Sequence, residues 1–82
     1  MEIQYARKAE KFLDTLHDPL ASRIKRAILN LALNPRPAGY IKLSGDLNYR
    51  IRVGDYRIVY QVQDKALLVL IVNIGHRSVV YD

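Results

Sequence analysis

The sequence predicts an α+β domain in which an N-terminal helical hairpin packs on one face of a four- to five-stranded, mostly antiparallel sheet. Apolar residues recur at helical spacing over residues 9–31, and they alternate or run together at strand spacing over residues 40–74. The predicted strands are separated by very short turns, whereas a parallel crossover needs about a dozen or more residues, so neighbouring strands should be antiparallel. We expect residues 1–82 to form a single domain.

The first half predicts one short strand and two helices. Ile3 and Tyr5 alternate with polar residues, as in a strand. Asp18-Pro19 predicts the start of the second helix, because aspartate is a good N-cap and proline a good first helical residue. The segment NPRP at residues 34–37 ends that helix. The apolar stripes that need a cover are Ala9, Phe12, Leu13 and Leu16 in the first helix and Leu20, Ile24, Ala27, Ile28 and Leu31 in the second.

The second half supplies the sheet that these stripes cover. Turn residues at 44–46, at Gly54-Asp55 and at Asp64-Lys65 bound the strands. Glycine in the first loop position suits a two-residue hairpin of type II′. The predicted strands cover residues 40–43, 48–53, 56–63 and 66–74.

Three arginines interrupt the best predicted hairpin, which reads NYRIRVGDYRIVYQV over residues 48–62. Alternation places Arg50 and Arg52 on one face, and a two-residue loop sets Arg52 opposite Arg57 and Arg50 opposite Val59. Opposed Cβ atoms lie about 5 Å apart, where like charges are destabilising. One interpretation is that these long side chains extend into solvent at little cost. The other is a site for an anion, and phosphate suits the planar fork of arginine.

Apolar residues also fall on the arginine-bearing face. Val59 lies beside the arginines, and residues 66–72 are apolar at nearly every position, so Leu68, Leu70 or both should point away from the helices. Since the chain has no further element to cover them, we expect these residues to bind a separate polypeptide.

Composition narrows the function classes. The net charge of +5 and the pI of about 9.7 favour an anionic partner. The absence of cysteine excludes disulfides and thiolate metal sites, and we expect no metal or cofactor. The longest apolar run, residues 66–72, is far shorter than the roughly 20 residues of a membrane helix, and the N-terminus carries no signal-peptide pattern. A cytoplasmic protein is expected.

The tail IGHRSVVYD, residues 74–82, completes a recognisable combination. The run YRIRVGDYRIVYQV followed by IGHRSVVY resembles the RelE/ParE superfamily of bacterial and archaeal toxins from toxin–antitoxin pairs. The preceding part, with LNPRP after the second helix and then KLSGDLNYRIR, is similar as well. The resemblance therefore covers essentially the whole chain.

For the RelE branch, the resemblance implies a ribosome-dependent endoribonuclease that cuts mRNA in the A site and so inhibits translation. The ribose 2′-OH attacks the adjacent phosphate, and no metal takes part. By position, Arg50 and Arg52 stand where two strand lysines are found, Arg57 matches a phosphate-binding arginine, Arg77 a tail arginine, and Tyr81 a C-terminal tyrosine. The expected RNA contacts are Lys42, Arg50, Arg52, Arg57 and Arg77.

One departure from the RelE pattern concerns the general base. A guanidinium with a pKa above about 12 is a poor base, whereas a lysine can have its pKa lowered. The base would then be His76, Tyr81, a ribosomal group or a minor deprotonated species. Histidine has an ordinary pKa of about 6.5, so His76 is the leading protein candidate and joins the expected catalytic set.

Two other functions fit the same resemblance. The ParE branch poisons DNA gyrase by protein–protein contact and needs no catalytic residues. A catalytically inactive homologue would bind RNA or the ribosome through phosphate contacts alone. In every case the superfamily implies an antitoxin from a neighbouring gene and a toxin–antitoxin hetero-oligomer. We expect that antitoxin to lie over the sheet or the helical hairpin, with its acidic residues near the arginines.

Overall fold

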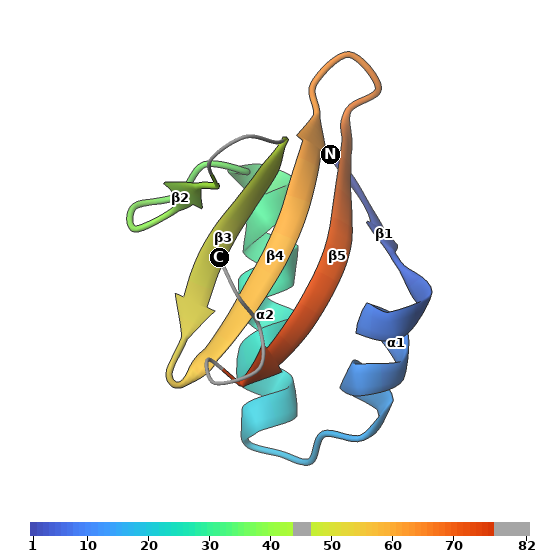
Figure 1. The fold of residues 1–82 in the computed structure, drawn as a ribbon, viewed down its shortest axis with the longest axis vertical. Helices are drawn as coiled ribbons and strands as arrows, with labels where there is room; N and C mark the ends of the chain where they lie inside the picture. Colours follow the sequence, from blue (N-terminus) through green and yellow to red (C-terminus); the bar gives the residue numbers. More distant parts are fainter. Residues whose placement is uncertain (44–46, 77–82) are drawn as a thin grey trace.

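The computed structural model describes residues 1–43 and 47–76, which form two helices on one side of a five-stranded sheet (Figure 1). The sheet has the strand order β1-β5-β4-β3-β2, and α2 runs behind its centre while α1 lies near the β1 edge. The predicted α+β class is confirmed. In chain order the elements are β1 (Glu2–Tyr5), α1 (Arg7–Asp14), α2 (Leu20–Leu33), β2 (Ile41–Lys42), β3 (Asn48–Val53), β4 (Tyr56–Gln63) and β5 (Leu68–His76).

The strands β2 to β5 pair antiparallel, as the short turns predict, but β1 pairs parallel with β5. Ile3 lies opposite Val69, and Tyr5 lies opposite Ile71. The parallel pairing is possible because the long connection through both helices and three strands separates β1 from β5 in the sequence.

Several element boundaries differ from the prediction. The strand predicted over residues 66–74 begins at Leu68 and ends at His76, because the preceding turn spans residues 64–67 and Leu67 adopts a left-handed φ of 53°. The helix predicted to start at Pro19 starts at Leu20. Asp18 nevertheless satisfies a backbone group of the first turn, since its carboxylate accepts a hydrogen bond from the Ser22 N–H at 3.0 Å.

The main core lies between the helices and the sheet. The apolar pattern of β5 fits that core only through a β-bulge: Val59 pairs with Asn73, but Tyr60 pairs with Ile71, so Val72 is an extra residue. The bulge lets Ile71 and Ile74 both face the helices, although simple alternation would separate them. The buried core residues are Ala9, Ile24, Ile28, Leu31, Ile51, Ile58, Tyr60, Val69, Ile71 and Ile74.

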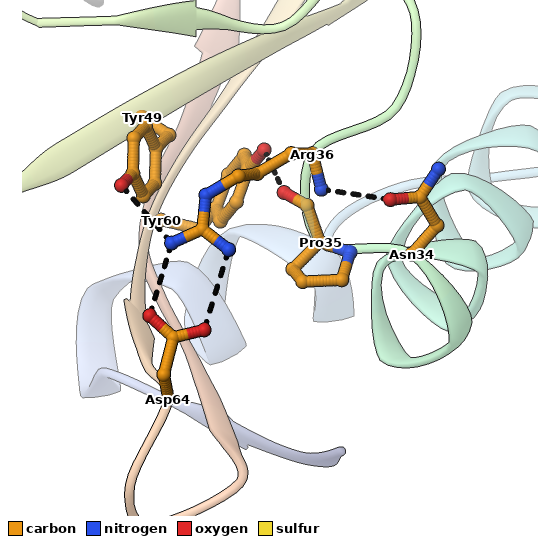
Figure 2. A network of polar contacts seen from close by, with 6 residues as sticks. All are labelled: Asn34, Pro35, Arg36, Tyr49, Tyr60 and Asp64. Atoms are coloured by element: carbon orange, nitrogen blue, oxygen red, sulfur yellow. Dashed lines mark hydrogen bonds and ion pairs between the residues drawn. The ribbon is translucent and has the colours of Figure 1, made fainter.

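A polar network ties the segment after α2 to the sheet (Figure 2). The Arg36 guanidinium contacts both carboxylate oxygens of Asp64, at 3.0 and 3.3 Å, and donates to the Tyr49 hydroxyl at 3.3 Å. Its Cζ also lies 5.3 Å from the centre of the Tyr49 ring. The Tyr60 hydroxyl donates to the Pro35 carbonyl at 2.7 Å, and burial raises the pKa of Tyr60 to about 12, so it remains a donor. The network therefore fixes one segment against β3, β4 and the β4–β5 turn.

The Asp64 carboxylate should make the stability of the fold depend on pH. Hydrogen bonds from Arg36 hold the pKa of Asp64 below its usual range. Stabilisation from a lowered pKa is present above the unfolded-state pKa of about 3.9 and is lost as the pH falls through the lower folded-state value. We expect Asp64→Asn to be modestly less stable than the wild type at pH 7, with the two converging as the pH falls below the lowered folded-state pKa of Asp64.

Urea denaturation of both proteins across this pH range checks the expectation. Asp55→Asn is the matched control, because Asp55 is an exposed aspartate in the β3–β4 turn, outside the network. A stability difference between Asp64→Asn and the wild type that stays constant with pH would show that the carboxylate charge has no role.

Candidate phosphate-binding face of the sheet

The hairpin of β3 and β4 has the predicted register. Arg52 lies opposite Arg57, and Arg50 lies opposite Val59. Gly54 has a φ of 60°, while Asp55 is not among the residues with positive φ, a combination that fits the predicted type II′ turn. The three arginines therefore share the side of the sheet opposite the helices, which we call the arginine face.

The three arginines differ in burial. Arg52 is exposed, Arg57 is half-buried, and only 6% of Arg50 is exposed. The Nε atoms of Arg50 and Arg57 are buried. Gly75, the partner of Arg57 on β5, has no side chain to hold Arg57 away from the sheet. The face thus carries one exposed guanidinium and two whose Nε atoms are buried.

Apolar residues lie opposite Arg50 in both neighbouring strands, Ile41 in β2 and Val59 in β4. Val59, the residue opposite Arg50, packs with Leu43 and the bulge residue Val72 in a second, smaller core on the arginine face. Val59 is only 5% exposed, so our expectation that it offers open apolar surface to a partner is wrong. Val59 packs against Leu43, which lies beyond the end of β2, and against Val72.

Leu68 and Leu70 alternate with Val69, which is buried in the main core, so they lie on the arginine face as predicted. Both are half-buried. Leu70 lies between Gln61 and Gln4, and Leu68 lies between Gln63 and Glu2 in the neighbouring strands. This end of the face combines partly exposed leucines with polar neighbours.

Other expected site residues lie elsewhere. His76 pairs with Tyr56, and their ring centres are 5.5 Å apart in an edge-to-face arrangement. The Tyr56 ring also contacts Phe12 of α1 at 6.1 Å, so the His76 ring lies on the helix side of the sheet. Lys42 is exposed and pairs with Tyr49, which also places it on the helix side by alternation. Arg77 and Tyr81 lie outside the described residues.

The burial of Arg50 was missed from the sequence, although a signal was present. Ile41 and Leu43 alternate with Lys42, and Ile41 pairs with Arg50. Two apolar residues on the face of an arginine indicate that its stem is covered. The bulge at Val72 was missed as well. A strand that is apolar at nearly every position shows no alternation of apolar and polar residues, so an extra residue leaves no irregularity in the sequence pattern.

The chemistry of the face is that of an anion site. A guanidinium stays charged at any working pH and donates hydrogen bonds from a rigid fork that matches phosphate oxygens. Within residues 1–43 and 47–76, no group of three or more His, Asp or Glu residues is placed to hold a metal ion. No helix in these two ranges is both long and apolar enough to cross a membrane.

Comparison with known proteins gives one family. The model for the ParE toxin of the type II toxin–antitoxin system parDE matches residues 3–81. A search of curated proteins finds no match.

Solved structures with a similar fold include RelE toxins and their complexes. The isolated E. coli RelE toxin has a TM-score of 0.80 and 26% identity, with 92% of this chain and 82% of that chain covered. A chain of the archaeal RelE–RelB complex from Pyrococcus horikoshii OT3 has a TM-score of 0.82 and 29% identity, with coverages of 96% and 97%. A chain of the E. coli RelBE toxin–antitoxin complex has a TM-score of 0.79 and 26% identity, covering 92% and 94%.

The opposition of Arg52 and Arg57 should lower the stability of the chain. We expect Arg52→Thr to raise the free energy of unfolding by about 0.5 kcal/mol at low salt, because it removes a like-charge cross-strand pair and adds a good strand former. The electrostatic part of the gain should shrink at high salt, where exposed charges are screened. Thermal unfolding at two salt concentrations measures both effects. Arg52→Lys, which keeps the charge, should show no comparable gain; equal gains in both variants would contradict repulsion as the cause.

Proposed function

Since the chain belongs to the ParE toxin family of type II toxin–antitoxin systems, we propose that it is the toxin of such a pair and acts as a ribosome-dependent mRNA endoribonuclease. The observation that carries this proposal is the convergence of Arg50, Arg52 and Arg57 on one face of the sheet. The likeness to RelE structures, at TM-scores of 0.80 and 0.82, is consistent with this proposal but does not separate it from a ParE-like function, because the two branches share a fold.

The proposed reaction is an internal transesterification. The ribose 2′-oxygen forms a bond to phosphorus, the bond from phosphorus to the 5′-oxygen breaks, and the products are a 2′,3′-cyclic phosphate and a 5′-OH. A base takes the 2′-OH proton, and the leaving 5′-oxygen gains a proton. Negative charge grows on the phosphorane oxygens in the transition state. Fixed guanidinium groups stabilise that charge without reorganisation, which is the role that we assign to Arg57 and Arg52.

The remaining arginines and the tyrosine have separate proposed roles. Arg50 is too buried to wrap around a phosphate, and we assign it to the fixed positive potential of the face. By resemblance, Arg77 contributes to charge stabilisation, and Tyr81 contacts the mRNA. We propose Lys42 as an outer RNA contact, since it is exposed at the β2 edge of the sheet.

The family also supports a second candidate function. The matching family model is that of the ParE toxin, and it spans residues 3–81. A ParE-like poison would bind DNA gyrase through protein contacts, and its arginines would then serve protein binding. An inactive RNA- or ribosome-binding homologue would use the same arginines for phosphate contacts only.

We propose a cognate antitoxin as the regulatory partner. Solved relatives include toxin–antitoxin complexes from E. coli and Pyrococcus horikoshii. An acidic antitoxin segment that lies across the arginine face would neutralise its charge and cover Leu68 and Leu70. The same segment would exclude mRNA and the ribosome from the arginines.

Cleavage in a purified translation system separates the candidates. Primer extension should reveal new mRNA 5′ ends with the wild type, and Arg57→Ala should lower the cleavage rate by about 100-fold or more, as for other transition-state donors. Arg52→Ala should also lower the cleavage rate. Because the Arg52 side chain is exposed, this substitution should leave the fold intact. Lys65→Ala is the control, since it removes one exposed positive charge in the β4–β5 turn.

The negative results are informative as well. A wild type that leaves mRNA intact but blocks supercoiling by gyrase would establish the ParE-like alternative. Binding to ribosomes with neither activity would establish the inactive homologue. Circular dichroism of each variant distinguishes loss of activity from loss of the fold.

The pH dependence of cleavage tests the role of His76. Its ring lies against Tyr56 on the helix side of the sheet, which favours a packing role over that of general base. We therefore expect His76→Gln to keep the wild-type shape of the pH–rate profile, with any loss in rate equal at all pH values. A profile that becomes flat between about pH 5 and 8 would instead identify His76 as the titrating base.

A further inference from the structure

The helix α2 carries two apolar faces, of which the fold uses one. Ile24, Ile28 and Leu31 are buried in the main core. Leu29 and Leu33 lie on the opposite side of the helix and are 64% and 87% exposed. Residues four apart on a helix are neighbours on its surface, so the two leucines form one patch.

Basic residues continue this patch along the same side of the helix. Lys25 precedes Leu29 by four residues, and Arg26 precedes Leu33 by seven, so all four side chains emerge on one side of α2. We call Lys25, Arg26, Leu29 and Leu33 the outer stripe; all four are exposed. The helix Leu20–Leu33 contains no acidic residue.

Asp18 precedes the helix, and its pKa is lowered by hydrogen bonds from Ser22 and, last among the causes, by the charge of Lys25. The outer stripe therefore joins exposed leucines to a net positive charge. A helical segment that laid leucine-like residues on Leu29 and Leu33 and carboxylates on Lys25 and Arg26 would satisfy both features.

We propose that the outer stripe of α2 binds an acidic, amphipathic helix of the antitoxin, as a contact separate from the arginine face. The inference rests on the antitoxin partner proposed above. A second copy of the chain fits less well, because it would bring a like-charged α2 against α2 in a protein whose net charge is already +5. An acidic partner gains both the apolar contact and the charge contact.

The position of the outer stripe gives this contact a function. The helices lie on one side of the sheet and the arginine face lies on the other (Figure 1). An antitoxin held at the outer stripe would bind the arginine face from a high local concentration, because the second contact becomes intramolecular. The outer stripe would thus set how much antitoxin is needed to neutralise the toxin, without taking part in cleavage.

Binding measurements with matched variants test the proposal. The probe is the purified product of the neighbouring small reading frame, titrated calorimetrically into the full chain. We expect Leu33→Asp to weaken binding by about tenfold or more, as for a buried interface anchor. Lys8→Ala is the control: it shifts the net charge by the same amount at an exposed position of α1, outside the outer stripe, and it should change the affinity by less than about threefold.

A second variant guards against misfolding. Leu33→Ala removes the apolar contact without adding a charge, and it should weaken binding in the same direction while keeping the wild-type melting temperature within a few degrees. Leu33→Asp and Leu33→Ala should both cleave mRNA at the wild-type rate when no antitoxin is present, since Leu33 lies away from the arginine face.

The outcomes separate this inference from the function on which it rests. If the wild type binds the antitoxin and both Leu33 variants bind equally well, the outer stripe is not the contact, while the proposed function stands. If the wild type does not bind the antitoxin, both the proposed antitoxin partner and the proposed contact at the outer stripe are wrong. Loss of a wild-type dimer in Leu33→Asp with unchanged antitoxin affinity would assign the outer stripe to self-association. Loss of cleavage by Leu33→Asp in the absence of antitoxin would indicate that the outer stripe binds the ribosome. Self-association or ribosome binding through the outer stripe would each overturn the proposal.

Discussion

Two helices cover only one face of the five-stranded sheet, and this constraint shapes the rest of the molecule. The main core is filled from one side by Ile24, Ile28 and Leu31 and from the other by β3, β4 and β5. Tyr60 is fully buried there, and its hydroxyl is satisfied by the Pro35 carbonyl. Among residues 1–43 and 47–76, the second face carries a smaller core around Val59, and the exposed Arg52 and the half-buried Arg57 beside it are accessible for binding.

The use of that second face conflicts with local stability. Arg52 and Arg57 occupy a cross-strand pair where a threonine pair or opposite charges would be more stable. The core on the other side of the same strands compensates, since Ile51 and Ile58 form the next pair along the hairpin and both are buried. The hairpin thus holds like charges together because its opposite face cannot separate without exposing the core. Such local conflict is typical of functional sites.

Fold alone does not distinguish the branches of this family. The chain belongs to the ParE toxin family, yet its backbone is also similar to RelE toxins. The distinction therefore rests on side chains, and above all on the arginine face. The placement of His76 against Tyr56 matters here as well, because it weakens the argument for a histidine base and leaves charge stabilisation as the best-supported contribution of the described residues.

Periodicity and turn chemistry by themselves determined the hairpin of β3 and β4, its register, and the sharing of one face by Arg50, Arg52 and Arg57. These features are local: a period of two residues and a two-residue loop leave a single pairing. The same holds for the buried stripe of α2, which follows from the helical period. The site was predictable to the extent that it lies within one hairpin.

Only the tertiary structure decided the features that depend on contacts between distant segments. These are the parallel pairing of β1 with β5, the bulge at Val72, the burial of Arg50, the helix-side position of His76 and the network around Arg36. No local pattern encodes which strand takes the sheet edge, or which side a residue faces after a bulge. Each is set by the requirement that one small core be filled from both sides at once.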